Sequence, residues 1–139
     1  MQKKIKLKKV KDAPLLMDFY INGIECIAVV DTGSQISLID ERFAKDCKLE
    51  LGDASEVGIT GACSSKDLIT KSFKQPITVE TDNGMEEYVV EGITADMSNL
   101  RRTFSRIVVG RVVMILGTDF LEKYKAKIHV KQKLMTIDE

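Results

Sequence analysis

The stretch AVVDTGSQISLID, residues 28–40, places a carboxylate between two apolar runs. A surface turn would account for Asp31 and Gly33, because both residue types suit tight turns. It accounts less well for the apolar residues on both sides, since burying a carboxylate without a partner is costly. The stretch therefore indicates a strand that ends in a carboxylate with a special role.

Length and composition predict one globular domain over residues 1–139, in which residues 1–13 form a basic strand or arm. The chain is 44% hydrophobic and 30% charged, as in an ordinary soluble protein, and 21 basic residues balance 21 acidic ones. Bulk charge therefore indicates no particular partner.

The basic first segment, MQKKIKLKKVKDA, has apolar residues in near alternation at Ile5, Leu7 and Val10. This pattern is typical of a strand with one solvated face or edge, where lysine also discourages aggregation. A nucleic-acid-binding arm is the alternative, but the interleaved aromatic residues expected of one are missing at 6% aromatic content. We therefore expect no nucleic-acid partner. No apolar run approaches the roughly 18 residues of a membrane span, so we expect no membrane partner either.

Three cysteines, Cys26, Cys47 and Cys63, are an odd number without Cys-x-x-Cys spacing. Free thiols in a reducing compartment are the simplest account, so we expect a cytoplasmic protein. Cys63 is either a redox-sensitive thiol or, more simply, a bystander. The only histidine, His129, lies in the alternating segment AKIHVKQKLMTI, which argues against a Cys-His enzyme and against a zinc site.

Short apolar runs separated by turn residues dominate the rest of the chain. Three β-hairpins are predicted, with turns at residues 21–23, 81–84 and 131–133. Helical signal is scarce: residues 39–47 offer one or two turns, residues 98–102 are weak, and residues 118–124 are the best candidate. The pattern predicts a mainly β domain with one or two short helices.

At two places the sequence resembles the retropepsin-like aspartic peptidases, the family of single-domain retroviral-type proteases. The matching motifs are Asp31-Thr32-Gly33-Ser34 and, some eighty residues later, Ile115-Leu116-Gly117. Between them, EVGITGA at residues 56–62 resembles the family's glycine-containing flap, and residues 115–137 resemble its C-terminal strand, helix and closing hairpin. The resemblance covers nearly the whole chain from about Leu15 and implies the closed β-barrel-like acid-protease fold.

The resemblance implies an aspartic endopeptidase that cleaves extended polypeptides without metal or cofactor. Two carboxylates sharing one proton can activate a water and protonate the substrate. Because the chain has one Asp-Thr-Gly, catalytic Asp31 would meet Asp31 of a second copy in a homodimer. By the same resemblance, Thr32 would hydrogen-bond across to the other copy of the loop, Ser34 would support the carboxylate from the side, and Gly33 would permit close backbone approach. The alternative is a catalytically inactive protease-fold domain for dimerisation or peptide binding.

Further site residues follow from the same resemblance. The expected flap and substrate-binding positions are Gly58, Ile59, Thr60 and Gly61, with a plain glycine-bearing surface turn as the alternative. Ile115, Leu116 and Gly117 are expected to pack beneath the aspartate loop. Asp119 is either a second catalytic carboxylate or, as we favour from its place at a helix start, a capping residue. His129 stands where relatives often carry an acidic residue.

Overall fold

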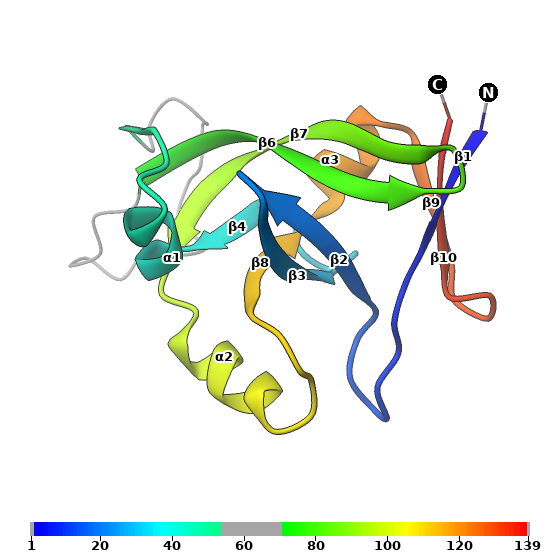
Figure 1. Ribbon diagram of the computed structural model, residues 1–139, viewed down its shortest axis with the longest axis horizontal. Coiled ribbons are helices and arrows are strands. Elements are labelled where there is room, and N and C mark those ends of the chain that lie inside the picture. The colour runs from blue at the N-terminus through cyan, green and yellow to red at the C-terminus, as the bar shows by residue number, and fades with distance from the viewer. Residues whose placement is uncertain (1, 54–70, 139) are drawn as a thin grey trace.

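The computed structural model describes residues 2–53 and 71–138, which form ten strands and three helices (Figure 1). The strands are β1 (Gln2–Lys6), β2 (Leu16–Ile21), β3 (Ile24–Val30), β4 (Ser37–Asp40), β5 (Leu51–Asp53), β6 (Lys71–Thr81), β7 (Gly84–Ala95), β8 (Val112–Leu116), β9 (Ala126–His129) and β10 (Leu134–Asp138). The helices are α1 (Glu41–Asp46), α2 (Ser98–Ser105) and α3 (Thr118–Lys123).

The larger sheet has the strand order β2-β3-β8-β4-β7-β6-β5. An additional pairing of β2 with β6, at Tyr20 and Thr78, closes the sheet into a barrel. Its interior is filled by large apolar side chains, among them Phe19, Ile39 and Met114, each with no exposed surface. The expectation of a mainly β, closed acid-protease barrel is confirmed.

The three hairpins form where the turn residues predicted them. In the first, Asn22 and Gly23 both have positive φ, at 50° and 80°, as a tight two-residue hairpin turn requires. The second joins β6 to β7 and the third joins β9 to β10, both as antiparallel pairs. Local turn chemistry therefore sets the register of the pairs β2–β3 and β6–β7 in the larger sheet and of the pair β9–β10.

Strand β8 is the element that organises the site. It lies between β3, to which it runs parallel, and β4, to which it runs antiparallel. Val30 at the end of β3 is opposite Leu116 at the end of β8. Because parallel strands end at the same edge of a sheet, the loops that follow these two strands must meet there.

The helical content is higher than the sequence indicated, since the weak segment at residues 98–102 lies within α2. No side chain caps the N-terminus of α2, so its local signal is poor. Tertiary contacts stabilise it instead: Phe104 is buried against β2, β3 and β8, and Arg101 Nε lies 3.6 Å from the buried carboxylate of Asp40. Asp40 Oδ1 also accepts a hydrogen bond from Met97 N–H.

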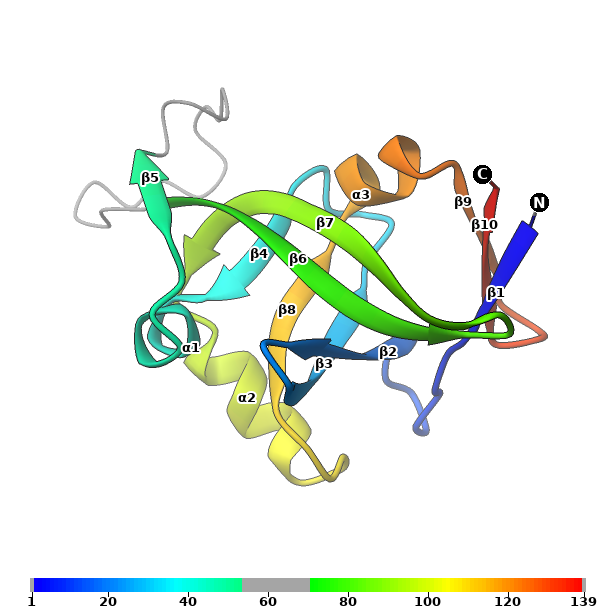
Figure 2. The same ribbon diagram turned by 45° about the horizontal axis from the view of Figure 1, so that its top comes forward.

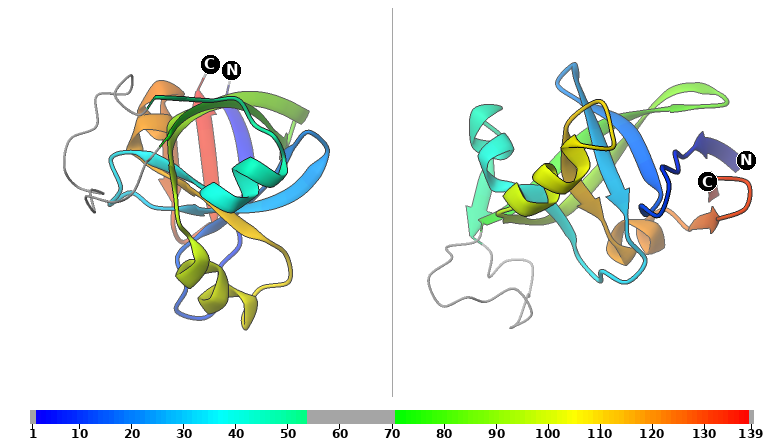
Figure 3. Two further views of the ribbon diagram at one scale, coloured as in Figure 1. Left: turned by 90° about the vertical axis from the view of Figure 1, so that its left-hand side faces the viewer. Right: turned by 90° about the horizontal axis from the view of Figure 1, so that it is seen from below.

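A small separate sheet, which we call the terminal sheet, has the order β1-β10-β9 and joins the two ends of the chain. It lies at the end of the molecule opposite α1 (Figure 3). One of its faces packs on the barrel through Ile5, Met135 and Ile137, which are at most 2% exposed. The predicted edge strand near the N-terminus is thus observed as β1.

Candidate active site

Asp31 is the first residue after β3, at the edge where β3 and β8 end together. Its backbone N–H donates a 3.0 Å hydrogen bond to the carbonyl of Leu116, which fixes the start of the loop to β8. In Figure 2 the loop between β3 and β4 stands beside α3, the helix that follows β8. The parallel pairing therefore brings two of the sequence motifs, Asp31 to Ser34 and Ile115 to Gly117, into contact.

The Asp31 carboxylate is held by its own loop. Oδ1 accepts a 2.9 Å hydrogen bond from Gly33 N–H, and a Cβ added at Gly33 would lie only 3.2 Å from that oxygen. Asp31 is half-buried, whereas Thr32 and Gly33 are exposed. Within the described residues the carboxylate makes no other hydrogen bond, so Oδ2 is available to a group from outside this part of the chain.

The second half of the loop is tied to the start of α3. The carbonyl of Ser34 accepts a 2.8 Å hydrogen bond from Thr118 N–H, and the Ser34 hydroxyl donates to the carbonyl of Ile36. A Cβ on Gly117 would lie 2.7 Å from the Ser34 carbonyl oxygen. Only glycine allows this approach. In the single chain the Ser34 hydroxyl donates to the backbone of its own loop, because the Ile36 carbonyl lies within reach, and not to the Asp31 carboxylate as the resemblance implies.

Ser37 and Asp119 form a contact that the sequence reading missed. Ser37 is fully buried, its hydroxyl donates to Asp119 Oδ1 at 2.7 Å, and its N–H donates to Oδ2 at 3.0 Å. The same hydroxyl accepts a 3.0 Å hydrogen bond from Gly117 N–H. The only available signal was a serine three residues after the first matching motif and an aspartate two residues after the second, and nothing local indicates that they meet.

This contact adds to the reading of Asp119 as a residue at a helix start. The N-cap residue of α3 is Gly117, and Asp119 accepts only the N–H of Phe120 within the helix, at 2.8 Å. Its two oxygens are taken by Ser37 and Phe120, which leaves little capacity for a reacting water. Asp119 therefore lies in the first turn of α3, as its place at a helix start predicted, and its carboxylate also supports the loop through Ser37.

The other two residues of the second motif lie on opposite faces of β8. Leu116 is fully buried in the main core, below the loop that carries Asp31. Ile115 is half-buried and packs on the cluster around Phe104, on the side of α2.

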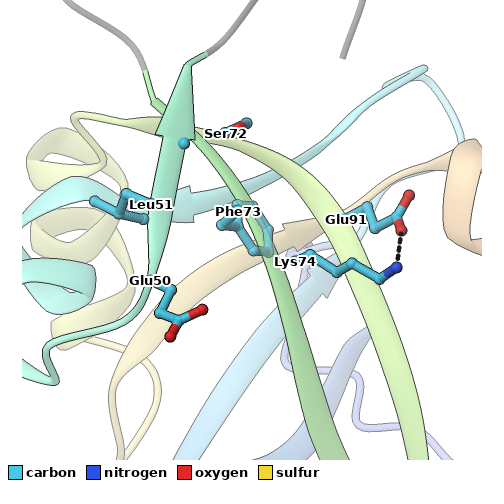
Figure 4. A pocket seen from close by; sticks show the side chains of 7 residues that line it. Glu50, Leu51, Ser72, Phe73, Lys74 and Glu91 are labelled. Atoms are coloured by element: carbon cyan, nitrogen blue, oxygen red, sulfur yellow. Dashed lines mark ion pairs between the residues drawn. The ribbon is translucent and has the colours of Figure 1, made fainter. Parts of the chain in front are cut away.

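The expected flap residues, Gly58 to Gly61, lie outside the described residues. The strands on either side of that segment, β5 and β6, pair antiparallel, with Asp53 opposite Lys71. Beside them is a hollow of about 410 Å³, shown in Figure 4, where Lys74 forms a 3.4 Å ion pair with Glu91. Asp31 does not line this hollow.

Cys26, Cys47 and His129 form no hydrogen bond with the Asp31 loop in the part of the chain that the structure describes. Burial raises the pKa of the Cys26 thiol to about 12 and, more weakly, the pKa of the Cys47 thiol. His129 Nε2 is 3.1 Å from Thr136 Oγ on the terminal sheet. Cys63 lies outside the described residues. Within residues 2–53 and 71–138, no group of three metal-ligating side chains occurs, and no helix is long and apolar enough to cross a membrane.

A closed barrel with an Asp-Thr-Gly loop after β3, held by a Gly-containing turn after β8, defines a retropepsin-like protease domain. The family model described as gag-polyprotein putative aspartyl protease matches residues 17–123, and the chain belongs to this retropepsin-like family. The chain is 26% identical over 124 residues to the Protein DNA-DAMAGE INDUCIBLE 1 of Arabidopsis thaliana. That match covers 88% of this chain but only 26% of the relative, so the chain spans about a quarter of the relative's length.

Solved structures share the fold at low sequence identity. The retroviral protease-like domain of Ddi1 from Leishmania major has a TM-score of 0.56 at 19% identity, covering 93% of this chain and 91% of that one. A retropepsin-like aspartic protease from Rickettsia conorii has a TM-score of 0.58 at 13% identity, covering 99% of this chain and 91% of that one. EIAV protease, in complex with the inhibitor HBY-793, has a TM-score of 0.50 at 18% identity, covering 88% of this chain and 99% of that one.

Proposed function

We propose that the chain is an aspartic endopeptidase whose active site forms between two copies related by a two-fold axis. The observation that carries this proposal is the state of Asp31 in the single chain. Its backbone N–H donates a 3.0 Å hydrogen bond to the Leu116 carbonyl, and its Oδ1 accepts a 2.9 Å hydrogen bond from Gly33 N–H. The adjoining Thr32 and Gly33 are exposed. Such a loop presents an oriented carboxylate at a surface where an identical loop can face it.

The chemistry follows from two facing carboxylates. At hydrogen-bonding distance the pair holds one proton, because two like charges so close repel strongly. The ionised Asp31 takes a proton from a bound water, which attacks the scissile carbonyl, while the protonated Asp31 donates to the carbonyl oxygen. The hydrogen bond from Gly33 N–H to Oδ1 keeps the carboxylate in place.

The substrate we propose is an extended polypeptide bound between the two subunits. An extended chain satisfies its backbone groups by pairing with strands or loops on either side. We also propose a reducing, cytoplasmic setting, in keeping with the free thiols of Cys26 and Cys47.

The test is hydrolysis of an unstructured protein by the purified chain and by an Asp31→Asn variant. We expect the variant to lose turnover and keep its fold, since the amide retains the volume but cannot act as base. Asp12→Asn, at an exposed position, is the matched control and should behave as wild type.

Dilution separates the dimeric mechanism from a monomeric one. Activity per mole should fall as the chain is diluted through its dissociation constant, with sedimentation measured at the same concentrations. An active monomer would refute the shared site. A dimer that binds peptides but cleaves none would identify a protease-fold binding domain instead.

A further inference from the structure

The balanced net charge conceals a strong separation of charge along the chain. Residues 2–11 contain six lysines, residues 123–137 contain five, and neither segment contains an aspartate or glutamate. These segments supply β1, β9 and most of β10, so the fold brings them together in the terminal sheet. The first segment by itself favours a protected edge strand, so the sequence predicts no nucleic-acid partner, an expectation that the proposal for both segments reverses.

The register shows which lysines face outward. Lys4 is opposite Thr136, which is opposite Lys127, and Lys6 is opposite Leu134. Residues directly opposite in a sheet share one face, and the other face carries the buried core residues such as Ile5. Lys4, Lys6 and Lys127 therefore point to solvent on one face, and exposed Lys131 and Lys133 extend it into the β9–β10 turn. We call these five residues the lysine face.

The lysines that flank the lysine face have partners for their side chains. On the face itself, an acidic group of the described residues bonds only to backbone, where Asp82 Oδ1 accepts a 2.9 Å hydrogen bond from Lys4 N–H. Lys3 pairs with Glu86 at 2.9 Å, Lys8 pairs with Asp18 at 2.8 Å, and the Lys9 ammonium donates to the carbonyl of Ala13. Within the described residues, none of the five lysines of the lysine face forms an ion pair. Asp138, at the end of β10 and opposite Gln2, lies on the same face as Lys4 and Lys6. Protection of strand edges explains a charge on β1 or β9 but not five lysines on one face that form no ion pair within the described part of the chain.

We propose that the lysine face binds the phosphate backbone of double-stranded nucleic acid without sequence preference. A duplex carries about one negative charge per 1.7 Å of its axis, a density that an acidic polypeptide reaches only with contiguous acidic residues. Alternate positions on a strand are about 6.8 Å apart and neighbouring strands about 4.8 Å, so the lysines form a spaced set of point charges. Residues 2–11 and 126–137 contain no Phe, Tyr or Trp on which unpaired bases could stack, which favours a duplex over a single strand.

The test is the fluorescence anisotropy of labelled DNA and RNA duplexes of unrelated sequence, titrated with the full chain at about 50 and 200 mM salt. We expect similar affinities for all duplexes and a steep loss at the higher salt. The triple variant Lys4→Gln, Lys6→Gln, Lys127→Gln should bind at least tenfold more weakly and flatten the logarithmic salt slope by up to about 2.7.

A matched control isolates this surface from net charge. The triple variant Lys45→Gln, Lys48→Gln, Lys71→Gln changes the charge equally at exposed positions outside the terminal sheet and should change affinity less than twofold. Asp31→Asn should bind as wild type, because the proposal does not depend on catalysis. Equal losses in both triple variants, absence of duplex binding at low salt, or stronger binding to polyglutamate or phosphatidylserine vesicles would each overturn the proposal.

Discussion

The hydroxyl of Ser37 donates a 2.7 Å hydrogen bond to Oδ1 of Asp119, a residue 82 positions later in the sequence. Ser37 begins β4, directly after the loop that carries Asp31, and Asp119 is in the first turn of α3. With the Gly117 N–H bound to the same hydroxyl, the end of the aspartate loop is fixed to β8 and α3 through one buried side chain. Asp119 therefore acts on the candidate active site through the backbone.

Replacing Ser37 with alanine tests this link. The change leaves the Gly117 N–H without its partner and removes one of the three hydrogen bonds to the Asp119 carboxylate. A buried unsatisfied group costs about 1–3 kcal/mol. We expect the free energy of unfolding to fall by about 2 kcal/mol, measured by urea denaturation. In the active dimer kcat should fall with KM little changed. Ser105→Ala, which removes an exposed hydroxyl from α2, is the control. A Ser37→Ala variant with wild-type stability would remove Asp119 from its supporting role.

Gly117 provides a steric test of the same region. A Cβ at this position would lie 2.7 Å from the Ser34 carbonyl oxygen, so Gly117→Ala must displace the aspartate loop. We expect a loss of kcat/KM of about tenfold or more, because small misplacements of catalytic groups are costly. Gly84→Ala introduces backbone strain at φ 96° in open space, and should lower stability by about 1 kcal/mol or more while sparing activity. Equal activity in the two variants would show that the contact does not position Asp31.

The pH dependence of association tests whether the two Asp31 residues face each other. If the dimer holds a shared proton that the separate monomers release, association takes up a proton and must weaken as pH rises. Asp31→Asn removes the repulsion, so its dissociation constant should vary less with pH above neutrality. Asp12→Asn should keep the wild-type dependence. Sedimentation across a pH series measures the dissociation constants of wild type and both variants. Identical pH profiles for wild type and Asp31→Asn would rule out the facing pair.

The activity of wild type should trace a bell against pH on the acidic side of neutral. The singly protonated pair is the active form, so both limbs report the pair rather than one residue. Steady-state hydrolysis of a fluorogenic peptide across the same pH series checks this. A rate that rises monotonically with pH would point to a single base instead.

Cys26 gives a prediction independent of catalysis. Burial raises the pKa of its thiol from 9.0 to about 12, so the folded state keeps it neutral where the unfolded state ionises it. The unfolded state therefore binds fewer protons in this interval, and stability is lost as pH rises from 9 toward 12. The free energies of unfolding of wild type and Cys26→Ala, measured by urea denaturation, should therefore converge over that interval. Native alkylation followed by mass spectrometry should label Cys47 well before Cys26, and the reverse order would contradict the buried assignment.

Local features of the fold could be read from the sequence. The hairpin turns at Asn22-Gly23 and at residues 82–83 follow from residues that tolerate positive φ or favour turns, and the alternation at Ile5 and Leu7 follows from a sheet with one buried face. Helix α2 could not be read as well, since Phe104 and Arg101 stabilise it through contacts with distant strands and with Asp40.

The sequence by itself determined which residues are the candidates for chemistry: Asp31 with its Gly33, and the Ile115 to Gly117 motif. It also determined the periodicity of each strand, because φ, ψ and side-chain alternation depend on near neighbours. Only the tertiary structure decided that β8 lies between β3 and β4, that Ser37 meets Asp119, and that two lysine-rich segments share one sheet. These pairings join residues about eighty or more positions apart, where the cost of closing the intervening chain is repaid only by the packing of the whole barrel.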